Sequence, residues 1–257
     1  MDPGIVVLGF VVGALVGLTG MGGAALLTPV LILFFDVRPI VAVGSDLVYQ
    51  AVTKGFGAFQ HSWQGTVNGC LVRWLAIGGV PASVAGIALT RLIHIQDGPG
   101  ADQLLGRMVA VALLMAGGIV IFRLFHQPRR HSDVQALCPY TRRMRVFTVI
   151  MGAVVGFTVS LTSVGSGSIL LPLLLLVYSL RASQAVGVDI FFAAMIVAVS
   201  GLGHFLSGNV DFPLVANLLV GSIPGVLLGS RLNVKIPDRA LRPGLAMMLI
   251  ALSLRLW

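Results

Sequence analysis

Long apolar segments separated by short polar ones make up most of this chain, and this pattern limits its fold more than any other feature. Eight apolar runs cover about residues 5–35, 39–61, 71–92, 104–125, 146–178, 184–207, 213–230 and 241–257. Most have the length of a helix that crosses a hydrocarbon core of about 30 Å. Because lipid offers the backbone no hydrogen-bond partners, helices are the simplest structure for such runs. The pattern therefore predicts an all-α integral membrane protein.

Composition supports a lipid environment and argues against several classes of function. Hydrophobic residues make up 57% of the chain and charged residues 10%, whereas a soluble domain has roughly 25% charged residues. The net charge of +8 suggests nucleic-acid binding, but most arginines lie between apolar runs, where membrane topology places them. No basic region precedes the first run, which favours an uncleaved membrane segment. Cys70 and Cys138 have neither zinc-site spacing nor the number that a disulfide framework needs, so no metal or cofactor is expected.

Two of the eight runs are too long for one simple helix. Residues 5–35 would span about 46 Å as a straight helix, and residues 146–178 slightly more. Each contains a Gly/Ser-rich interruption followed by a proline, at 20–23 before Pro29 and at 163–167 before Pro172. Such sequences break helices. Each long run is therefore predicted to cross as a broken helix or to turn back as a re-entrant segment.

The chain also contains an internal duplication. At a shift of 143 residues, rare residue types coincide in the pairs Pro29/Pro172, Gly44/Gly187, Asp46/Asp189, His61/His204, Gly65/Gly208, Gly78/Gly221, Pro81/Pro224 and Gly86/Gly229. Before the breaks the glycines align at 139 instead, Gly13 with Gly152 and Gly17 with Gly156, which predicts four extra residues in the second break. We expect a first membrane repeat at 1–126, a polar basic linker at 127–145 and a second membrane repeat at 146–257.

Basic residues distinguish parallel halves from inverted ones. If each long run crosses once, sixteen of the Lys and Arg residues divide eight and eight between the two sides. If each run re-enters, the halves are inverted, each with three further transmembrane helices. One side then holds Arg73, Arg123, Arg129, Arg130, Arg142, Arg143, Arg145, Arg181, Arg231, Lys235, Arg239 and Arg242, and the other Arg38, Arg91, Arg107 and Arg255. Twelve against four obeys the positive-inside rule. Inverted repeats with a cytoplasmic linker and both termini outside are favoured, in the plasma membrane.

These motifs resemble those of the TauE/SafE-type sulfite exporter family, also called toluene sulfonate uptake permeases. The glycine-rich break that ends at Pro29 carries the resemblance, although Ala24 replaces the last glycine of that cluster. So does His-x-x-x-Gly-x-Val-Asn/Asp, which occurs at 61–68 and again at 204–211. The resemblance covers nearly the whole chain. It implies a bacterial inner-membrane transporter of sulfite, sulfoacetate or other sulfonates, without fixing the substrate.

The two breaks are the leading candidates for the substrate site. An interrupted helix frees backbone N–H groups and adds a positive dipole end, and both stabilise an oxyanion. The candidates are Thr19, Gly20, Gly22 and Gly23 in the first half and Thr162, Ser163, Gly165, Ser166 and Gly167 in the second. The alternative is that the small residues only pack helices, as expected for Gly225-x-x-x-Gly229. Such faces also make a homodimer conceivable.

Charged residues inside the spans form a second group of candidates. Lys54 lies within the run 39–61, where a charge tends to be paired or functional. It either attracts the anion or forms an ion pair, for which Asp189 is a better partner than Asp46, eight residues away on the same helix. Asp46 and Asp189 could carry protons, or support the first turn of their helices. His61 and His204 suit a proton step, or else hydrogen-bond at the membrane interface.

An anion transporter explains the duplication, the paired breaks and Lys54 together. An enzyme would need a nucleophile and base or a paired acidic motif, and neither is evident. A metal carrier would need a cluster of His, Asp or Cys on one helix face. Two alternatives stay open: a non-transporting membrane accessory or assembly subunit, and a channel or carrier for another small solute. The expected partners are a small anion and the lipid bilayer, without nucleic acid.

Overall fold

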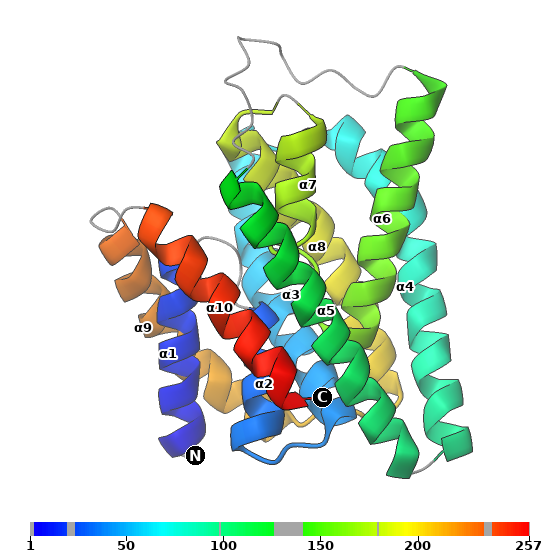
Figure 1. The fold of residues 1–257 in the computed structure, drawn as a ribbon, viewed down its shortest axis with the longest axis vertical. Coiled ribbons are helices and arrows are strands. Elements are labelled where there is room, and N and C mark those ends of the chain that lie inside the picture. Colours follow the sequence, from blue (N-terminus) through cyan, green and yellow to red (C-terminus); the bar gives the residue numbers. More distant parts are fainter. Residues whose placement is uncertain are drawn as a thin grey trace.

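The computed structural model describes residues 3–19, 24–97, 99–125, 141–178, 180–233 and 238–256. The regular structure of these residues is helical throughout (Figure 1). The helices are α1 Pro3–Thr19, α2 Ala24–Phe34, α3 Pro39–Trp63, α4 Gly69–Asp97, α5 Pro99–Phe125, α6 Arg142–Thr162, α7 Leu170–Val177, α8 Ala182–Leu206, α9 Phe212–Asn233 and α10 Asp238–Leu256. The predicted all-α class is confirmed for the described residues.

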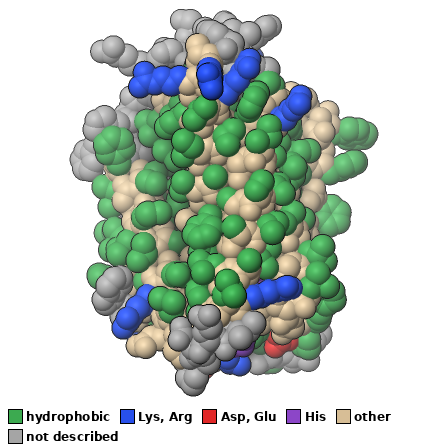
Figure 2. Space-filling model, turned by 90° about the vertical axis from the view of Figure 1, so that its right-hand side faces the viewer, with side chains coloured by type: hydrophobic (Ala, Val, Ile, Leu, Met, Phe, Trp, Pro, Cys, Tyr) green, Lys and Arg blue, Asp and Glu red, His purple; other side chains and the backbone are tan. Residues whose placement is uncertain are grey.

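Five stretches of these helices are long and apolar enough to cross a membrane. They are Gly69–His94, Gly100–Phe122, Arg142–Thr162, Ala182–Leu206 and Phe212–Gly229. On the face drawn in Figure 2, hydrophobic side chains cover the middle and Lys and Arg lie toward the two ends. This distribution is what a lipid-facing surface requires, because charged groups are costly in hydrocarbon.

Both long apolar runs are divided into two helices, as their composition predicts. The first run forms α1 and α2, and the second forms α6 and α7. Pro29 lies inside α2, and Pro172 lies inside α7. In Figure 1, α2 lies in the lower half of the view, near the N- and C-termini, whereas α7 lies in the upper half, near the start of α6.

Helices of the two sequence halves pack on each other across the molecule. The most extensive contacts join α1 with α9, α4 with α6, α3 with α8 and α5 with α10. Glycines allow the first two pairs to approach closely. A Cβ at Gly225 or Gly229 of α9 would lie 2.2 or 2.1 Å from a carbonyl oxygen of α1. These small-residue faces are used within the chain, so they no longer argue for a homodimer.

The glycine contacts also correct the alignment of the two halves. Two contacts of one half recur in the other. The contact of Gly9 with Leu218 corresponds to that of Gly152 with Leu75, and the contact of Gly13 with Ser222 corresponds to that of Gly156 with Gly79. Every one of these correspondences has a shift of 143 residues. The shift of 139 and the four-residue insertion were therefore wrong. Four residues are close to one helical turn, so both alignments place the glycines on the same helix face.

The structure adds one feature that the cysteine spacing did not predict. Cys70, at the start of α4, is disulfide-bonded. The other cysteine of the chain, Cys138, lies outside the described residues. A single bridge remains far from a disulfide framework.

Candidate functional site

A polar stripe on α3 faces the break of the second half. Asp46, Gln50 and Lys54 follow one another at four-residue spacing, which places them along one side of the helix. Asp46 and Gln50 are buried, with 0% and 2% of their surface exposed, and Lys54 is half-buried. Buried polar groups need partners, and the stripe finds most of them in residues 162–168.

Ser163 is the first residue of the second break to meet this stripe. It ends α6 in the left-handed conformation, with φ at 62°, and its N–H donates to the carbonyl of Val159 at 2.8 Å. Its Oγ donates to Asp46 Oδ2 at 2.8 Å. Gln50 Nε2 in turn donates to Ser163 Oγ. A conformation that usually requires glycine is therefore combined with a hydroxyl that joins the two halves.

Asp46 connects three segments of the chain. Besides the bond from Ser163, its Oδ2 accepts a hydrogen bond from Thr28 Oγ1 of α2 at 2.6 Å. The other carboxylate oxygen, Oδ1, is buried and has no hydrogen-bond partner among the described residues, as is also true of Gln50 Oε1. The stripe therefore keeps two buried acceptors available beside the break.

Lys54 contacts the second break one turn further along α3. Its Nζ donates to Ser166 Oγ. The expected ion pair with Asp189 is not formed, because among the described residues Arg38 and Asp102 form the only ion pair. Asp189 Oδ1 instead accepts the N–H of Gly167 at 3.0 Å, and its attraction on Lys54 acts over a longer distance. The Lys54 ammonium is thus directed at a hydroxyl rather than neutralised by a carboxylate.

The backbone of the break has conformations that favour glycine. Gly165 has φ at 151° and Gly167 has φ at 68°, values that side chains with a Cβ rarely adopt. Thr162 supports the turn from its N-terminal side, because its Oγ1 donates to the carbonyl of Thr158 at 2.7 Å and accepts the N–H of Val164 at 3.2 Å. The five site residues predicted from 162–167 are therefore brought together with Lys54, Asp46 and Asp189.

The first break is only partly within the described residues. Thr19 ends α1, while Gly20, Gly22 and Gly23 lie outside the described residues. At a shift of 143, the counterparts of Gln50, Lys54, Ser163 and Ser166 are Ala193, Val197, Gly20 and Gly23. The polar groups of the site are consequently concentrated in one of its two repeat-related positions.

Thr28 and Gln50 contribute to the site without having been predicted from the sequence. The four-residue spacing of Asp46, Gln50 and Lys54 was a usable signal for Gln50. Thr28 had no such signal, because a threonine in an apolar run most often bonds its own helix backbone.

The two predicted histidines, His61 and His204, lie near the ends of α3 and α8. His61 Nδ1 lies 2.9 Å from Thr66 Oγ1, in the turn that follows α3. His204 is buried, and its Nε2 lies 3.0 Å from the carbonyl oxygen of Ser160 on α6. Both contacts fix the end of a helix against a neighbouring segment, and neither involves the polar stripe.

The rest of the recurring motif builds helix connections. Gly65 and Gly208 have φ at 65° and 74° and end the turns after α3 and α8. Asn68 Oδ1 accepts the N–H of Leu71, and Asp211 Oδ1 accepts the N–H of Leu214, at the starts of α4 and α9. Asn and Asp are preferred at helix starts for this reason. The motif therefore shapes the connections from α3 to α4 and from α8 to α9.

The arrangement gathers hydrogen-bond donors of the kind that small anions accept. An ammonium, two serine hydroxyls and a glycine-rich backbone meet at the contact of the two halves. Among the described residues, no group of three or more His, Cys, Asp or Glu could hold a metal ion.

Comparisons with known proteins agree with the motifs. The family model described as "Sulfite exporter TauE/SafE" matches residues 5–256. "Probable membrane transporter protein YjnA" of Bacillus subtilis is 40% identical over the full length of both chains. "Probable membrane transporter protein YdhB" of the same organism is 27% identical over 93% of each chain. "Probable membrane transporter protein MJ0441" of Methanocaldococcus jannaschii is 24% identical over 93% of this chain and 89% of its own.

No solved structure matches the chain. The family match spans nearly all of the residues, including both breaks and both copies of the histidine motif. This chain is therefore an integral, multi-pass membrane protein that belongs to the TauE/SafE sulfite exporter family of membrane transporters.

Proposed function

We propose that this protein is a secondary transporter of small sulfur-containing anions, sulfite or organosulfonates, in the plasma membrane. The observation that carries the proposal is the Lys54 ammonium, which points from α3 at Ser166 in the second break. An ammonium inside a membrane bundle is costly and marks a functional site by default. An oxyanion that takes the place of the Lys54–Ser166 contact would find both donors already oriented.

Alternating access is the proposed mechanism, and the packing suggests which parts move. The halves are proposed to be inverted repeats, supported by repeat-related contacts that exchange partners between the halves. One half could be expected to rock against the other, but glycines pack α1 closely on α9 and α4 on α6, and both contacts join the two halves. We therefore place the moving part across the halves. Helices α1 and α9 also share a hydrophobic cluster with α2 and α3, separate from the larger core. We therefore propose that α1 and α9 move together as one body during the cycle.

The proposed topology has a cytoplasmic linker and both termini outside. The count of twelve basic residues against four supports it. In Figure 1 the two termini lie toward one end of the bundle and α6 starts at the other, as an odd number of crossings in each half would require.

Proton coupling through Asp46 is proposed as part of the cycle. Its Oδ1 is buried beside the break without a partner among the described residues. A proton there would remove one negative charge from the site as the anion enters, which lowers the electrostatic cost of binding. The repeat-related Asp189 is committed to the Gly167 N–H and serves as a structural counterpart.

Binding to the purified protein tests this function. Sulfite, sulfoacetate, taurine and thiosulfate are added separately, and a ligand that binds the folded state raises the unfolding temperature. We expect a dose-dependent rise with at least one anion, and its loss in Ser166→Ala. The absence of a rise with every anion would favour a different solute or an accessory role.

A further inference from the structure

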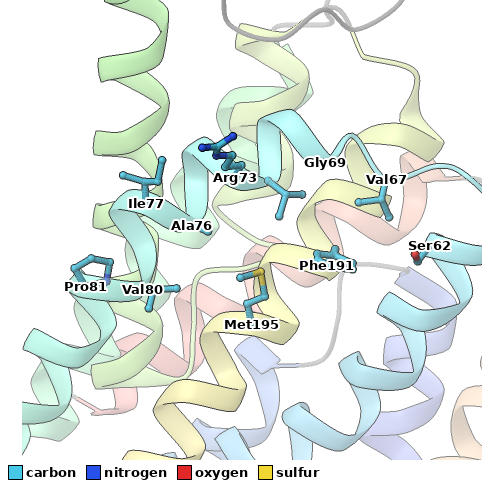
Figure 3. A pocket seen from close by; sticks show the side chains of 11 residues that line it. Ser62, Val67, Gly69, Arg73, Ala76, Ile77, Val80, Pro81, Phe191 and Met195 are labelled. Atoms are coloured by element: carbon cyan, nitrogen blue, oxygen red, sulfur yellow. The ribbon is translucent and has the colours of Figure 1, made fainter.

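A groove of about 870 Å³ lies outside the proposed transport site, where α4 passes α8 (Figure 3). Its walls are mainly apolar side chains: Val72, Ala76 and Val80 from α4, and Phe191 and Met195 from α8. Both helices contain stretches able to cross a membrane. The groove therefore lies at a depth where hydrocarbon chains surround the protein.

One end of the groove carries a cation. Arg73 lines the groove one turn after α4 begins at Gly69, and Figure 3 places both residues toward the same end. Its side chain is exposed and makes no hydrogen bond or ion pair with any described residue. The positive end of the α4 dipole adds to its charge, because Arg73 lies close to the helix start.

The neighbouring residues indicate the depth of Arg73 in the membrane. Trp74 follows it in sequence, and the Arg145 guanidinium lies 5.3 Å from the centre of the Trp74 ring. Tryptophan prefers the level of the lipid headgroups. Ser62, near the end of α3, lines the same groove and adds a hydroxyl. The groove is thus apolar along its length and positive where headgroup phosphates lie.

We propose that this groove binds an anionic phospholipid, with an acyl chain along α4 and α8 and the phosphate held by Arg73. The ligand matches the groove in both respects, since a hydrocarbon tail fills the apolar walls and the anionic head meets an otherwise unpaired guanidinium. The groove is separate from the polar stripe on α3, and lipid binding in it does not depend on which solute is transported.

The full-length protein, purified in detergent, provides the test. Its unfolding temperature is measured against increasing phosphatidylglycerol, phosphatidylcholine of the same acyl chains, and inorganic phosphate. Half-maximal stabilisation should need roughly fivefold less phosphatidylglycerol than phosphatidylcholine, the preference expected for one cation near the headgroups. Inorganic phosphate should have little effect, because it lacks the chain that fills the groove.

Two variants identify the groove as the site. Arg73→Gln should abolish the preference for phosphatidylglycerol, whereas Arg143→Gln, which removes an exposed arginine from the start of α6, should retain it. Ala76→Leu narrows the groove and should weaken both lipids, with folding confirmed by gel filtration. Equal stabilisation by the two lipids, equal effects of the two arginine variants, or a full effect of inorganic phosphate would each overturn the proposal.

Discussion

Replacing Lys54 by methionine separates a role in binding from a role in folding. Methionine has nearly the length of lysine and keeps an apolar stem, but it removes the ammonium that contacts Ser166. A hydrogen bond to a charged group is worth about 1.5–3 kcal/mol. If the bound anion receives that bond, its Kd should rise about 10- to 150-fold in Lys54→Met.

The electrostatics of the site predict a second, distinguishable effect. Lys54 attracts the buried carboxylates Asp189 and Asp46, so its removal should also lower stability. Replacing Asp189 by asparagine in the same chain removes one of those charges. The double variant Lys54→Met/Asp189→Asn should recover part of the stability without recovering anion affinity, because it still lacks the ammonium that binds the anion.

The assay is anion binding to purified protein, read from the shift of the unfolding temperature and checked by calorimetry. Lys54→Arg, which keeps the charge, should retain measurable binding, and Arg107→Met controls for the loss of an exposed cation. Unchanged affinity in a folded Lys54→Met variant would refute the reasoning. Recovery of affinity in the double variant would also refute it, since balance of charge would then be the only role of Lys54.

Further predictions follow from the same contacts. Ser163→Gly relieves the strain of a left-handed residue, about 1–2 kcal/mol, but leaves the hydrogen-bond partners of Ser163 unsatisfied, which costs about 1–3 kcal/mol. We expect a lower free energy of unfolding in urea, and a clear gain in stability would contradict the assigned contacts. Gly44→Ala should cost about 1–3 kcal/mol, because its Cβ would lie 2.1 Å from the carbonyl oxygen of Asn209, whereas Gly55→Ala has open space and should be neutral; equal effects would contradict this packing. Asp46→Asn should make transport insensitive to an imposed pH gradient in vesicles, and retained sensitivity would remove Asp46 from proton coupling. A cysteine placed at Ser132, with the native cysteines replaced, should resist impermeant maleimide in intact cells, because the linker is proposed to be cytoplasmic. Labelling of that cysteine would place the linker outside. A Cys70 disulfide found in the wild-type protein isolated from cells would do the same, because disulfides persist in oxidising compartments.

Much of the fold follows from the sequence because membrane helices are long and apolar and have few alternatives. The breaks before Pro29 and Pro172 appear as ends of helices at the predicted places. The repeat register before the breaks was ambiguous, since glycines at Gly9 and Gly13 lie one turn apart and match either alignment. Only contacts with α9 and α4 distinguish them.

The site was predictable to a smaller extent. Polar residues in an apolar run identify Asp46 and Lys54, because burying them has a cost that only a partner or a function offsets. Their partners depend on which segments meet in space. The serine contacts of Lys54 and Asp46 cross from one half to the other over more than a hundred residues, and helical spacing contains no information about such pairs.

Solute counterflow in proteoliposomes tests the central claim most directly. Vesicles loaded with unlabelled sulfite, sulfoacetate, taurine or thiosulfate are diluted into a trace of the same compound carrying radioactive sulfur. We predict transient accumulation of label with at least one of these compounds, absent from protein-free vesicles and strongly reduced by Lys54→Met. Folded wild-type protein that accumulates none of the four would contradict the account of this chain as a transporter of small sulfur-containing anions.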